Sequence, residues 1–246
     1  MKINNICKVF FVLNLFFILN QTKAQTWTSF FNPTYVKSIV FDNQGNQWIG
    51  TTYGLVKFDG SKYTSYDWTN GLSDNTINSI AVDNQGKIWV GTRNGVSMYN
   101  GSNWVKFFTT DGLANNYVSS VAIDTNGDKW FGTLCGLTKY NGSNWTTYKT
   151  NNGLVNDTIN FIKIDNDGNK WIATRNGVSR LSGNNFVNYK MKNGNPIFTD
   201  RSVLTIGIDN DNKLYFGTNH CILSFDGINW HTLINNTCTY DPCVFN

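Results

Sequence analysis

The chain has 246 residues and a formal net charge of +4, with 40% hydrophobic and only 15% charged residues. All 16 acidic residues are aspartate, and 37 residues are aromatic: 9 Trp, 11 Tyr and 17 Phe. Strand-favouring aromatics and turn formers are plentiful and good helix formers are scarce, which excludes a coiled coil or a helical bundle. The absence of glutamate excludes any mechanism that needs a catalytic Glu, and the low charge with many aromatics argues against disorder.

The first 24 residues have the pattern of a secretory signal peptide. Two lysines precede an apolar run over residues 9–19, and small residues end at Ala24, so we expect cleavage near Ala24 and a mature chain beginning at Gln25. This run is too short to cross a bilayer, which takes about 20 residues. A membrane anchor is the alternative interpretation. We predict a protein exported to the periplasm or the extracellular space, without membrane insertion of the mature chain.

Cleavage also changes the charge of the chain. It removes Lys2, Lys8 and Lys23, which leaves 17 basic residues against 16 aspartates, a formal charge of +1. No basic run remains, so the sequence lacks the electrostatic pattern of a nucleic-acid-binding protein.

One unit of about 41 residues is repeated five times in the predicted domain, residues 25–234. Its most regular segment is an aromatic residue followed by an apolar residue, Gly or Ala, and Thr, at spacings of 41, 41, 41 and 44 residues. These segments begin at Trp48, Trp89, Trp130, Trp171 and Tyr215. An aspartate stands six positions before each of them: Asp42, Asp83, Asp124, Asp165 and Asp209. Five agreeing registers indicate a repeat architecture.

Within each unit the apolar residues alternate with a period of two, which predicts strands. A strand that ends at the aspartate is followed by a turn, the Gly-Thr strand, a third strand, a tight Asp-Gly or Asn-Gly hairpin and a fourth strand. Four antiparallel strands per repeat are the blade of a β-propeller. We therefore predict an all-β propeller of four-stranded antiparallel blades, five in number, rather than an open β-solenoid. The repeated tryptophans are expected in the core and not in sugar-binding platforms.

This unit resembles the two-component regulator propeller repeat over residues 26–234. The resemblance lies in an apolar strand ending in Asp, then Gly, Trp-Ile-Gly-Thr, Gly-Leu, and an aromatic with Asp-Gly or Asn-Gly. The family occurs in periplasmic sensor portions of hybrid histidine kinases and in exported bacterial proteins. The resemblance implies a propeller that senses a ligand, often a glycan. More distantly, the chain is similar to the streptogramin lyase propellers.

The sequence departs from the sensor family in two respects. It shows no transmembrane helix, kinase or regulator domain, so signalling by phosphotransfer is not expected. It also has five repeats where the family usually builds seven blades per ring. Residues 27–30 match a fourth strand, which gives twenty-one strands where five blades need twenty. This extra strand either adds to the edge of the last blade or the ring closes in another way.

Strand direction places one set of variable residues on the same rim of the propeller, in the turn after each Gly-Thr segment. A rim of variable loops on a repeated scaffold is where binding residues are expected. The candidate ligand-binding residues are Tyr53, Arg93, Asn94, Arg175, Asn176, Asn219 and His220. The guanidinium groups of Arg93 and Arg175 suit a carboxylate, a phosphate or a polyhydroxylated ligand. The alternatives are an interaction with an aspartate of a neighbouring loop, or solvation.

Catalytic and metal-binding patterns are weak. The turns that begin at Asp42 and Asp165 lack the ligand spacing and the glutamate of an EF-hand, and an aspartate-capped turn explains them better. The resemblance to lyase propellers implies a metal-binding His pair with a Glu, but His231 falls on an outer strand, away from His220. We expect no cofactor, no metal and no catalytic residue. A metal-dependent lyase that uses His220 is the alternative.

Four cysteines remain after cleavage. Cys238 and Cys243 lie in the tail, residues 235–246, and are a candidate disulfide in an oxidising compartment. A bond from Cys221 to Cys238 is the alternative. Together these features predict an exported, non-enzymatic propeller whose rim binds a glycan, another small polar molecule or a protein partner.

Overall fold

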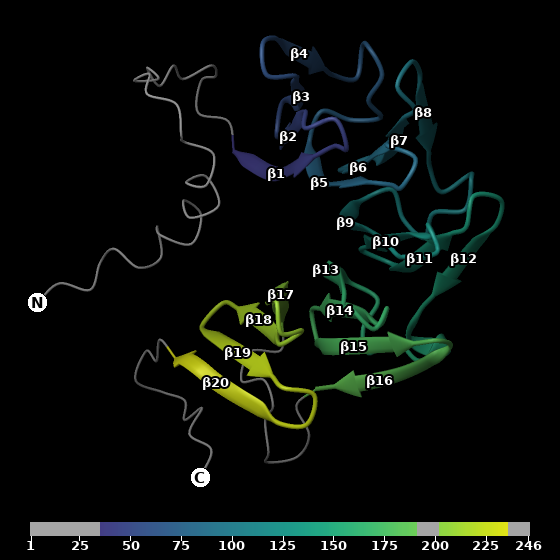
Figure 1. The fold of residues 1–246 in the computed structure, drawn as a ribbon. Helices are drawn as coiled ribbons and strands as arrows, with labels where there is room; N and C mark the ends of the chain where they lie inside the picture. Colours follow the sequence, from purple (N-terminus) through teal and green to yellow (C-terminus); the bar gives the residue numbers. More distant parts are fainter. Residues whose placement is uncertain (1–34, 191–201, 236–246) are drawn as a thin grey trace, which may run out of the picture. The chain divides into compact units, whose positions relative to one another are not determined.

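The protein is described by a computed structural model in residues 35–190 and 202–235, which form five four-stranded antiparallel sheets (Figure 1). Each sheet takes its strands in chain order, and we call the sheets blades 1 to 5. Blade 1 contains β1 (Val36–Phe41), β2 (Gln47–Thr51), β3 (Gly54–Phe58) and β4 (Tyr63–Tyr66). Blade 2 contains β5 (Ile77–Val82), β6 (Ile88–Thr92), β7 (Gly95–Tyr99) and β8 (Trp104–Phe107).

The other three blades follow the same order. Blade 3 contains β9 (Val118–Ile123), β10 (Lys129–Thr133), β11 (Gly136–Tyr140) and β12 (Trp145–Tyr148). Blade 4 contains β13 (Ile159–Ile164), β14 (Lys170–Thr174), β15 (Gly177–Ser182) and β16 (Asn185–Tyr189). Blade 5 contains β17 (Val203–Ile208), β18 (Leu214–Thr218), β19 (Cys221–Phe225) and β20 (Trp230–Asn235). The 3-10 turn η2 (Thr150–Asn152) precedes blade 4.

The predicted fold class is confirmed: the described chain is an all-β propeller of five four-stranded antiparallel blades. Three predictions fall outside the described residues: the signal peptide with its cleavage site, the strand at residues 27–30, and the disulfide between Cys238 and Cys243.

The repeated aspartate and aromatic form one polar unit at the turn between the first and second strands of each blade. In blade 1, Asp42 Oδ1 accepts hydrogen bonds from the backbone N–H groups of Gln44 and Asn46, which closes the turn between β1 and β2. Asp42 Oδ2 accepts the indole N–H of Trp48 at 2.9 Å. The same carboxylate-to-indole bond recurs in blades 2 to 4, and the Tyr215 hydroxyl takes the place of the indole in blade 5. The interpretation of these turns as aspartate-capped is therefore confirmed.

The tryptophans of this repeat lie in the core, as predicted. Trp48, Trp89, Trp130 and Trp171 are only 1–3% exposed. Each packs in a cluster that joins two consecutive blades. Trp171 of blade 4, for example, packs with Phe216 and Phe225 of blade 5. Without the aspartate, the buried indole N–H would have no hydrogen-bond acceptor. The aspartate therefore allows a tryptophan to fill the space between blades.

The first strand of each blade contains a β-bulge, and in blades 2, 3 and 4 the bulged residue links the blade to the next one. The bulged residues of blades 2, 3 and 4 are Asn78, Ser119 and Asn160. A bulge turns its extra side chain away from the regular alternation. Each of these three side chains donates a hydrogen bond to a backbone carbonyl at the start of the next blade's first strand. The first strands of consecutive blades therefore lie side by side, as Figure 1 shows.

The loop between blades explains why Gly-Leu belongs to the repeat. Gly112 has φ +128°, and a Cβ there would lie 2.5 Å from the side chain of Trp145, the outer-strand aromatic of the following blade. Gly71 meets Trp104 in the same way. The next residue of each loop, Leu72 or Leu113, is buried. The glycine lets the aromatic of one blade cover the loop of the blade before it.

Blade 1 differs from the others on one face. Its first-strand residues Val36 and Ile39 are 46% and 50% exposed, whereas Ile77 and Ile80 at the equivalent positions of blade 2 are 0% and 5% exposed. In blades 2 to 5 this face packs on the blade that precedes it in the chain. No blade precedes blade 1 among the described residues.

Candidate binding rim

The turns after the Gly-Thr segments and the loops between blades lie on the same side of the described blades, as the strand directions predict. The Arg93 N–H donates to the Thr76 carbonyl in the loop that enters blade 2, and the Gly95 N–H donates to the Asn116 carbonyl in the loop that leaves it. Arg175 makes the equivalent bond to Thr158. We call the turns 52–53, 93–94, 134–135, 175–176 and 219–220, with the loops 67–76, 108–117 and 149–158, the loop rim.

The threonine of each Gly-Thr segment fixes the turn that follows it. Thr92 is fully buried; its Oγ1 donates to the Gly95 carbonyl at 2.8 Å and accepts the Asn94 N–H at 3.1 Å. Thr51, Thr133 and Thr174 make the same pair of bonds. A constant buried hydroxyl thus holds the turn, and the two residues at its tip are free to vary.

The structure places every predicted rim residue at a turn tip. Tyr53, Arg93, Asn94, Arg175, Asn219 and His220 are exposed, and Asn176 is half-buried. Arg93 and Arg175 belong to blades 2 and 4, so the turn of blade 3, with Leu134 and Cys135, lies between them in chain order. The structure records no direct contact that brings the two guanidinium groups together.

The acidic and the basic side chains of the loop rim differ in whether they have partners. Its aspartates accept backbone N–H groups of their own loops: Asp74 from Thr76, Asp111 from Phe108 and Asp157 from Thr150, at 2.7–2.8 Å. Neither Arg93 nor Arg175 forms an ion pair with any residue in 35–190 or 202–235. The carboxylates are therefore engaged in holding the loops, while the two guanidinium groups face solvent. The alternative of an ion pair to a neighbouring loop is not observed.

The two histidines lie far apart. His220 is at the loop rim, at the start of β19, while His231 pairs with Ser224 near the other end of that strand. Four residues of strand separate these points, roughly 13 Å at about 3.3 Å per residue. His231 Nε2 lies 3.1 Å from Asp226 Oδ2 at the opposite rim. No group of three or more potential metal ligands was found within the described ranges.

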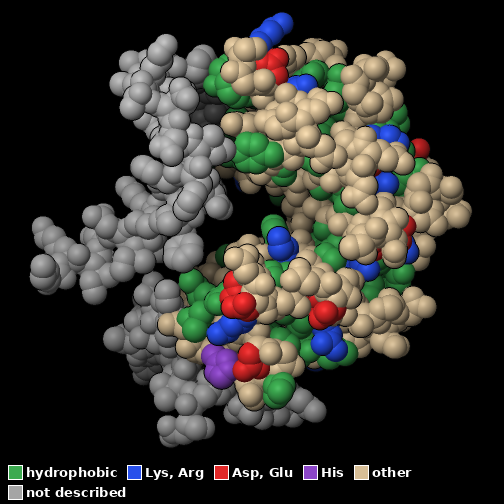
Figure 2. All heavy atoms as spheres, viewed as in Figure 1, with side chains coloured by type: hydrophobic (Ala, Val, Ile, Leu, Met, Phe, Trp, Pro, Cys, Tyr) green, Lys and Arg blue, Asp and Glu red, His purple; other side chains and the backbone are tan. Residues whose placement is uncertain are grey.

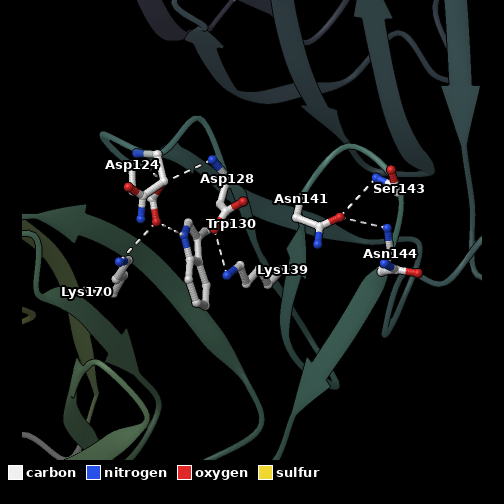
Figure 3. A network of polar contacts seen from close by, with 9 residues as sticks. Asp124, Asp128, Trp130, Lys139, Asn141, Ser143, Asn144 and Lys170 are labelled. Carbon is white, nitrogen blue, oxygen red and sulfur yellow. Dashed lines mark hydrogen bonds and ion pairs between the residues drawn. The ribbon is translucent and has the colours of Figure 1, made fainter.

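The opposite rim carries a charge network that sequence reasoning missed. Asp124 Oδ2 accepts the Trp130 indole N–H at 3.0 Å and lies 3.0 Å from Lys170 Nζ, which comes from blade 4 (Figure 3). Lys170 Nζ also lies 5.1 Å from the centre of the Trp130 ring. Lys129 of blade 3 relates to Asp83 and Trp89 of blade 2 in the same way, with a longer ion pair of 3.7 Å.

The network governs the protonation of its members. Burial raises the pKa of Asp124, but hydrogen bonds from Trp130 and Lys170 outweigh it, so the pKa lies below its usual value. A hydrogen bond to Asp128 raises the pKa of Lys139, whose Nζ is 2.6 Å from that carboxylate. The sequence does show a lysine directly before Trp130 and another directly before Trp171. The aspartate that each lysine pairs with belongs to the preceding blade, so the pairing is not visible along the chain. This network serves packing between blades and is separate from the loop rim.

Three exposed aromatic residues at the loop-rim end of blade 1, two of them in the loop rim itself, were largely missed by sequence reasoning. Tyr35, Tyr53 and Trp68 are 77%, 73% and 64% exposed, and only Tyr53 was among the predicted residues. The sequence does show these aromatics as departures from the repeat, because the equivalent residues 41 positions later, in blade 2, are Thr76, Asn94 and Thr109. Cys135, in the equivalent turn of blade 3, is also exposed, and its Sγ lies 3.5 Å from the side-chain amide nitrogen of Asn115.

The surface seen in Figure 2 shows acidic and basic side chains interspersed and not gathered by sign. No helix in residues 35–190 or 202–235 is long and apolar enough to cross a membrane.

Comparison with known proteins confirms the resemblance inferred from the repeat. The family model of the two component regulator propeller matches residues 71–94, which include the Gly-Leu loop, the capped turn and the Gly-Thr segment of blade 2. A comparison with curated proteins gave no match.

Solved structures with the same fold include extracellular domains of two proteins from B. thetaiotaomicron described as hybrid two-component systems. The first is 26% identical, with a TM-score of 0.73 over 84% of this chain, and the second 23% identical, with a TM-score of 0.68 over 82%. This chain spans only 30% and 28% of their lengths. Virginiamycin B lyase from Staphylococcus aureus is 15% identical, with a TM-score of 0.66 over 82% of this chain and 71% of the lyase, which shows a common fold alone. The chain is thus a β-propeller that resembles the extracellular domains of proteins described as hybrid two-component systems.

Proposed function

We propose that this chain is an exported, non-enzymatic propeller that binds a small polar ligand or glycan at the loop rim. One observation carries the proposal: Arg93 and Arg175, two of four arginines in the chain, stand in the same Thr-Arg-Asn-Gly-Val-Ser string at the tips of equivalent turns. Both side chains are exposed and form no ion pair with a described residue. A planar guanidinium on a rigid turn is suited to bidentate recognition of carboxylate or hydroxyl groups.

The comparisons support this proposal in part. The neighbours with the higher identities are described as extracellular domains of two-component systems, which agrees with export and with a sensing role. Because this chain spans less than a third of those proteins, their complete activity is not transferred to it. The separation of His220 from His231 argues against the alternative of a lyase built on a histidine pair.

A thermal-shift screen tests the proposal. The purified protein is heated with neutral oligosaccharides, uronic acids and small organic carboxylates. At a ligand concentration of about 100 times Kd, binding adds about 2.7 kcal/mol to the free energy of unfolding, which raises Tm by several degrees. Replacing both arginines, Arg93→Ala with Arg175→Ala, should abolish this shift. Lys106→Ala, which removes one exposed charge from the outer strand β8, is the matched control and should keep it.

Two outcomes contradict the proposal. If no compound in the screen raises Tm, or if the double arginine variant retains the full shift, the loop rim is not the ligand site. Chelator-sensitive turnover of a streptogramin that is lost in His220→Ala would instead favour the lyase alternative. If only a protein partner is recovered, by pull-down from the native periplasmic or secreted fraction, the chain is an interaction module.

A further inference from the structure

Two faces of the described blades have no other blade packed on them. Where consecutive blades meet, the later blade turns its leading face toward the earlier one, and the earlier blade turns its trailing face toward the later one. The leading face of blade 1 and the trailing face of blade 5 have no such neighbour among residues 35–190 and 202–235. These two faces are the halves of one kind of interface, which the chain forms four times between its own blades.

Apolar side chains stand out from the leading face of blade 1. Val36, Ile39 and Phe41 of β1 are all exposed, whereas the residues equivalent to Val36 and Ile39 in blades 2 to 5 are buried. Cross-strand pairing continues this face from Phe41 to Phe58 and Tyr63, whose rings stack with their centres 4.4 Å apart. A contiguous apolar surface of this kind marks an interaction site.

The trailing face of blade 5 carries the recess into which such side chains fit. In blade 1 the glycine of the Gly-Thr segment makes this recess, because a Cβ on Gly50 would lie 2.5 Å from the Ile77 side chain of blade 2. Gly217 is the equivalent glycine of blade 5, and the only described residue within 4 Å of a Cβ there is Thr205 of its own blade. Ile222, which pairs with Gly217, is 39% exposed. The residues at its position in blades 1 to 4 are fully buried: Leu55, Val96, Leu137 and Val178.

A hydrogen bond that joins consecutive blades is also left half-made at these two faces. The Ile80 N–H of blade 2 donates to Ser38 Oγ of blade 1 at 3.2 Å, and the same bond joins blade 3 to blade 2 and blade 4 to blade 3. The equivalent donor of blade 1 is the Ile39 N–H, to which no preceding blade offers a hydroxyl. The equivalent acceptor of blade 5 is Thr205, which is exposed and whose hydroxyl has no partner among the described residues. Blade 4 has Phe161 at this position, so the strand itself does not require a hydroxyl there.

We propose that a second copy of this chain covers these faces, with blade 5 of one copy packed on blade 1 of the next. Val36 and Ile39 of one copy fill the recess at Gly217 of the other, and the Ile39 N–H donates to the hydroxyl of Thr205. Two leading faces would oppose protruding side chains without a recess, and two trailing faces would leave both recesses empty, so the contact is head-to-tail. Such a contact either closes into a ring or continues as an open array.

The ends of the repeat array support this assembly. A repeat protein that stays monomeric normally ends in capping repeats with polar outer faces, which these two faces lack. The contact reuses an interface that the chain already forms between its own blades, so a second copy brings the matching surface without any new chemistry. The assembly does not involve the two arginines of the loop rim, and it stands or falls independently of ligand binding there.

Sedimentation velocity of the full-length secreted protein tests the assembly. We expect the mass to rise above that of the monomer as the concentration increases, because the association is reversible and dilute chains keep both faces open. Ile39→Arg puts an unpaired charge in the leading face and Ile222→Arg puts one in the trailing face, so each should raise the dissociation constant by about a hundredfold or more. Val105→Arg changes an equally exposed residue of the outer strand β8 and should leave the association unchanged.

Mixing the two arginine variants makes the test specific for a head-to-tail contact. The Ile39→Arg chain keeps its trailing face and the Ile222→Arg chain keeps its leading face. Each variant alone should therefore sediment as a monomer, and the equimolar mixture should form a one-to-one dimer and nothing larger.

Four outcomes overturn the proposal. The original protein stays a monomer at every concentration, or both arginine variants associate as well as it does. Alternatively, Ile222→Arg keeps an association that Ile39→Arg loses, which means that two leading faces meet, or the mixture of the two variants stays monomeric. An unchanged circular dichroism spectrum shows that a variant is folded, and Val36→Arg replaces Ile39→Arg in the leading face if that chain does not fold.

Discussion

At the scale of single residues, the aspartate before each Gly-Thr strand holds three separate parts of a blade. Asp124 accepts two backbone N–H groups of its turn, the indole of Trp130, and the ammonium of Lys170 from the next blade. Its side chain is almost completely buried, so the carboxylate depends on these protein partners and not on water. A single carboxylate thus joins a turn, a core tryptophan and a neighbouring blade.

Removing this carboxylate should destabilise the protein more than an ordinary surface change. Asp124→Ala leaves the Trp130 indole, two turn N–H groups and the Lys170 ammonium without their acceptor, and we expect a loss of about 2–4 kcal/mol. Urea denaturation followed by tryptophan fluorescence measures it. Asp209→Ala is the matched change in blade 5, where a tyrosine replaces the tryptophan and the site is more open, and its loss should be smaller. Equal losses would show that the buried indole and the lysine contribute nothing.

At the scale of elements, the hairpins between third and fourth strands of blades 1, 2, 3 and 5 come in two chemical versions, one closed by Asp and one by Asn. Asp59 Oδ1 accepts the N–H groups of Ser61 and Lys62. Asn100 and Asn141 make the same two bonds in blades 2 and 3 with an amide oxygen. The geometry is the same, but only the aspartate version can be protonated.

The two versions should therefore respond differently to acid. Hydrogen bonds from Lys62 and Ser61 lower the pKa of Asp59 to about 2, from 3.8. A lowered pKa means that the carboxylate stabilises the hairpin above pH 4, and this stabilisation is lost as pH falls from about 4 to about 2. In NMR spectra recorded over that range, the amide signals of Ser61 and Lys62 should titrate, while those of the Asn100 and Asn141 hairpins should not. An Asp59 midpoint near 3.8 would contradict the hydrogen bonds seen here.

Local elements were predictable and contacts between blades were not. The strands, the hairpins and the aspartate-capped turns follow from the period of two and from glycine and aspartate positions, which act within a few residues. The Lys170 to Asp124 bridge and the packing of Trp145 on Gly112 join residues of different repeats, so their partners are not visible along the chain. The rim positions of Arg93 and Arg175 were predictable because strand direction fixes them.

At the scale of the whole molecule, each blade gains stability from the blade before it. Ile80, Val121, Ile162 and Ile206 occupy the same first-strand position in blades 2 to 5 and are 3–7% exposed. Ile39 occupies that position in blade 1 and is 50% exposed. The sequence of the strand is nearly the same in both cases, so the difference in burial comes from the neighbouring blade and not from the strand.

This difference in burial allows a direct test of whether packing on the preceding blade stabilises the first strand. Ile80→Ala opens a cavity in a cluster that includes Trp48, Leu55 and Val90, so we expect a loss of about 2–4 kcal/mol. Ile39→Ala removes the same atoms from a half-exposed side chain and should cost less than about 1 kcal/mol. The two losses are compared by urea denaturation of variants prepared in parallel. If Ile39→Ala costs as much as Ile80→Ala, the face of blade 1 is covered in solution, and the first blade has a neighbour just as the other four do.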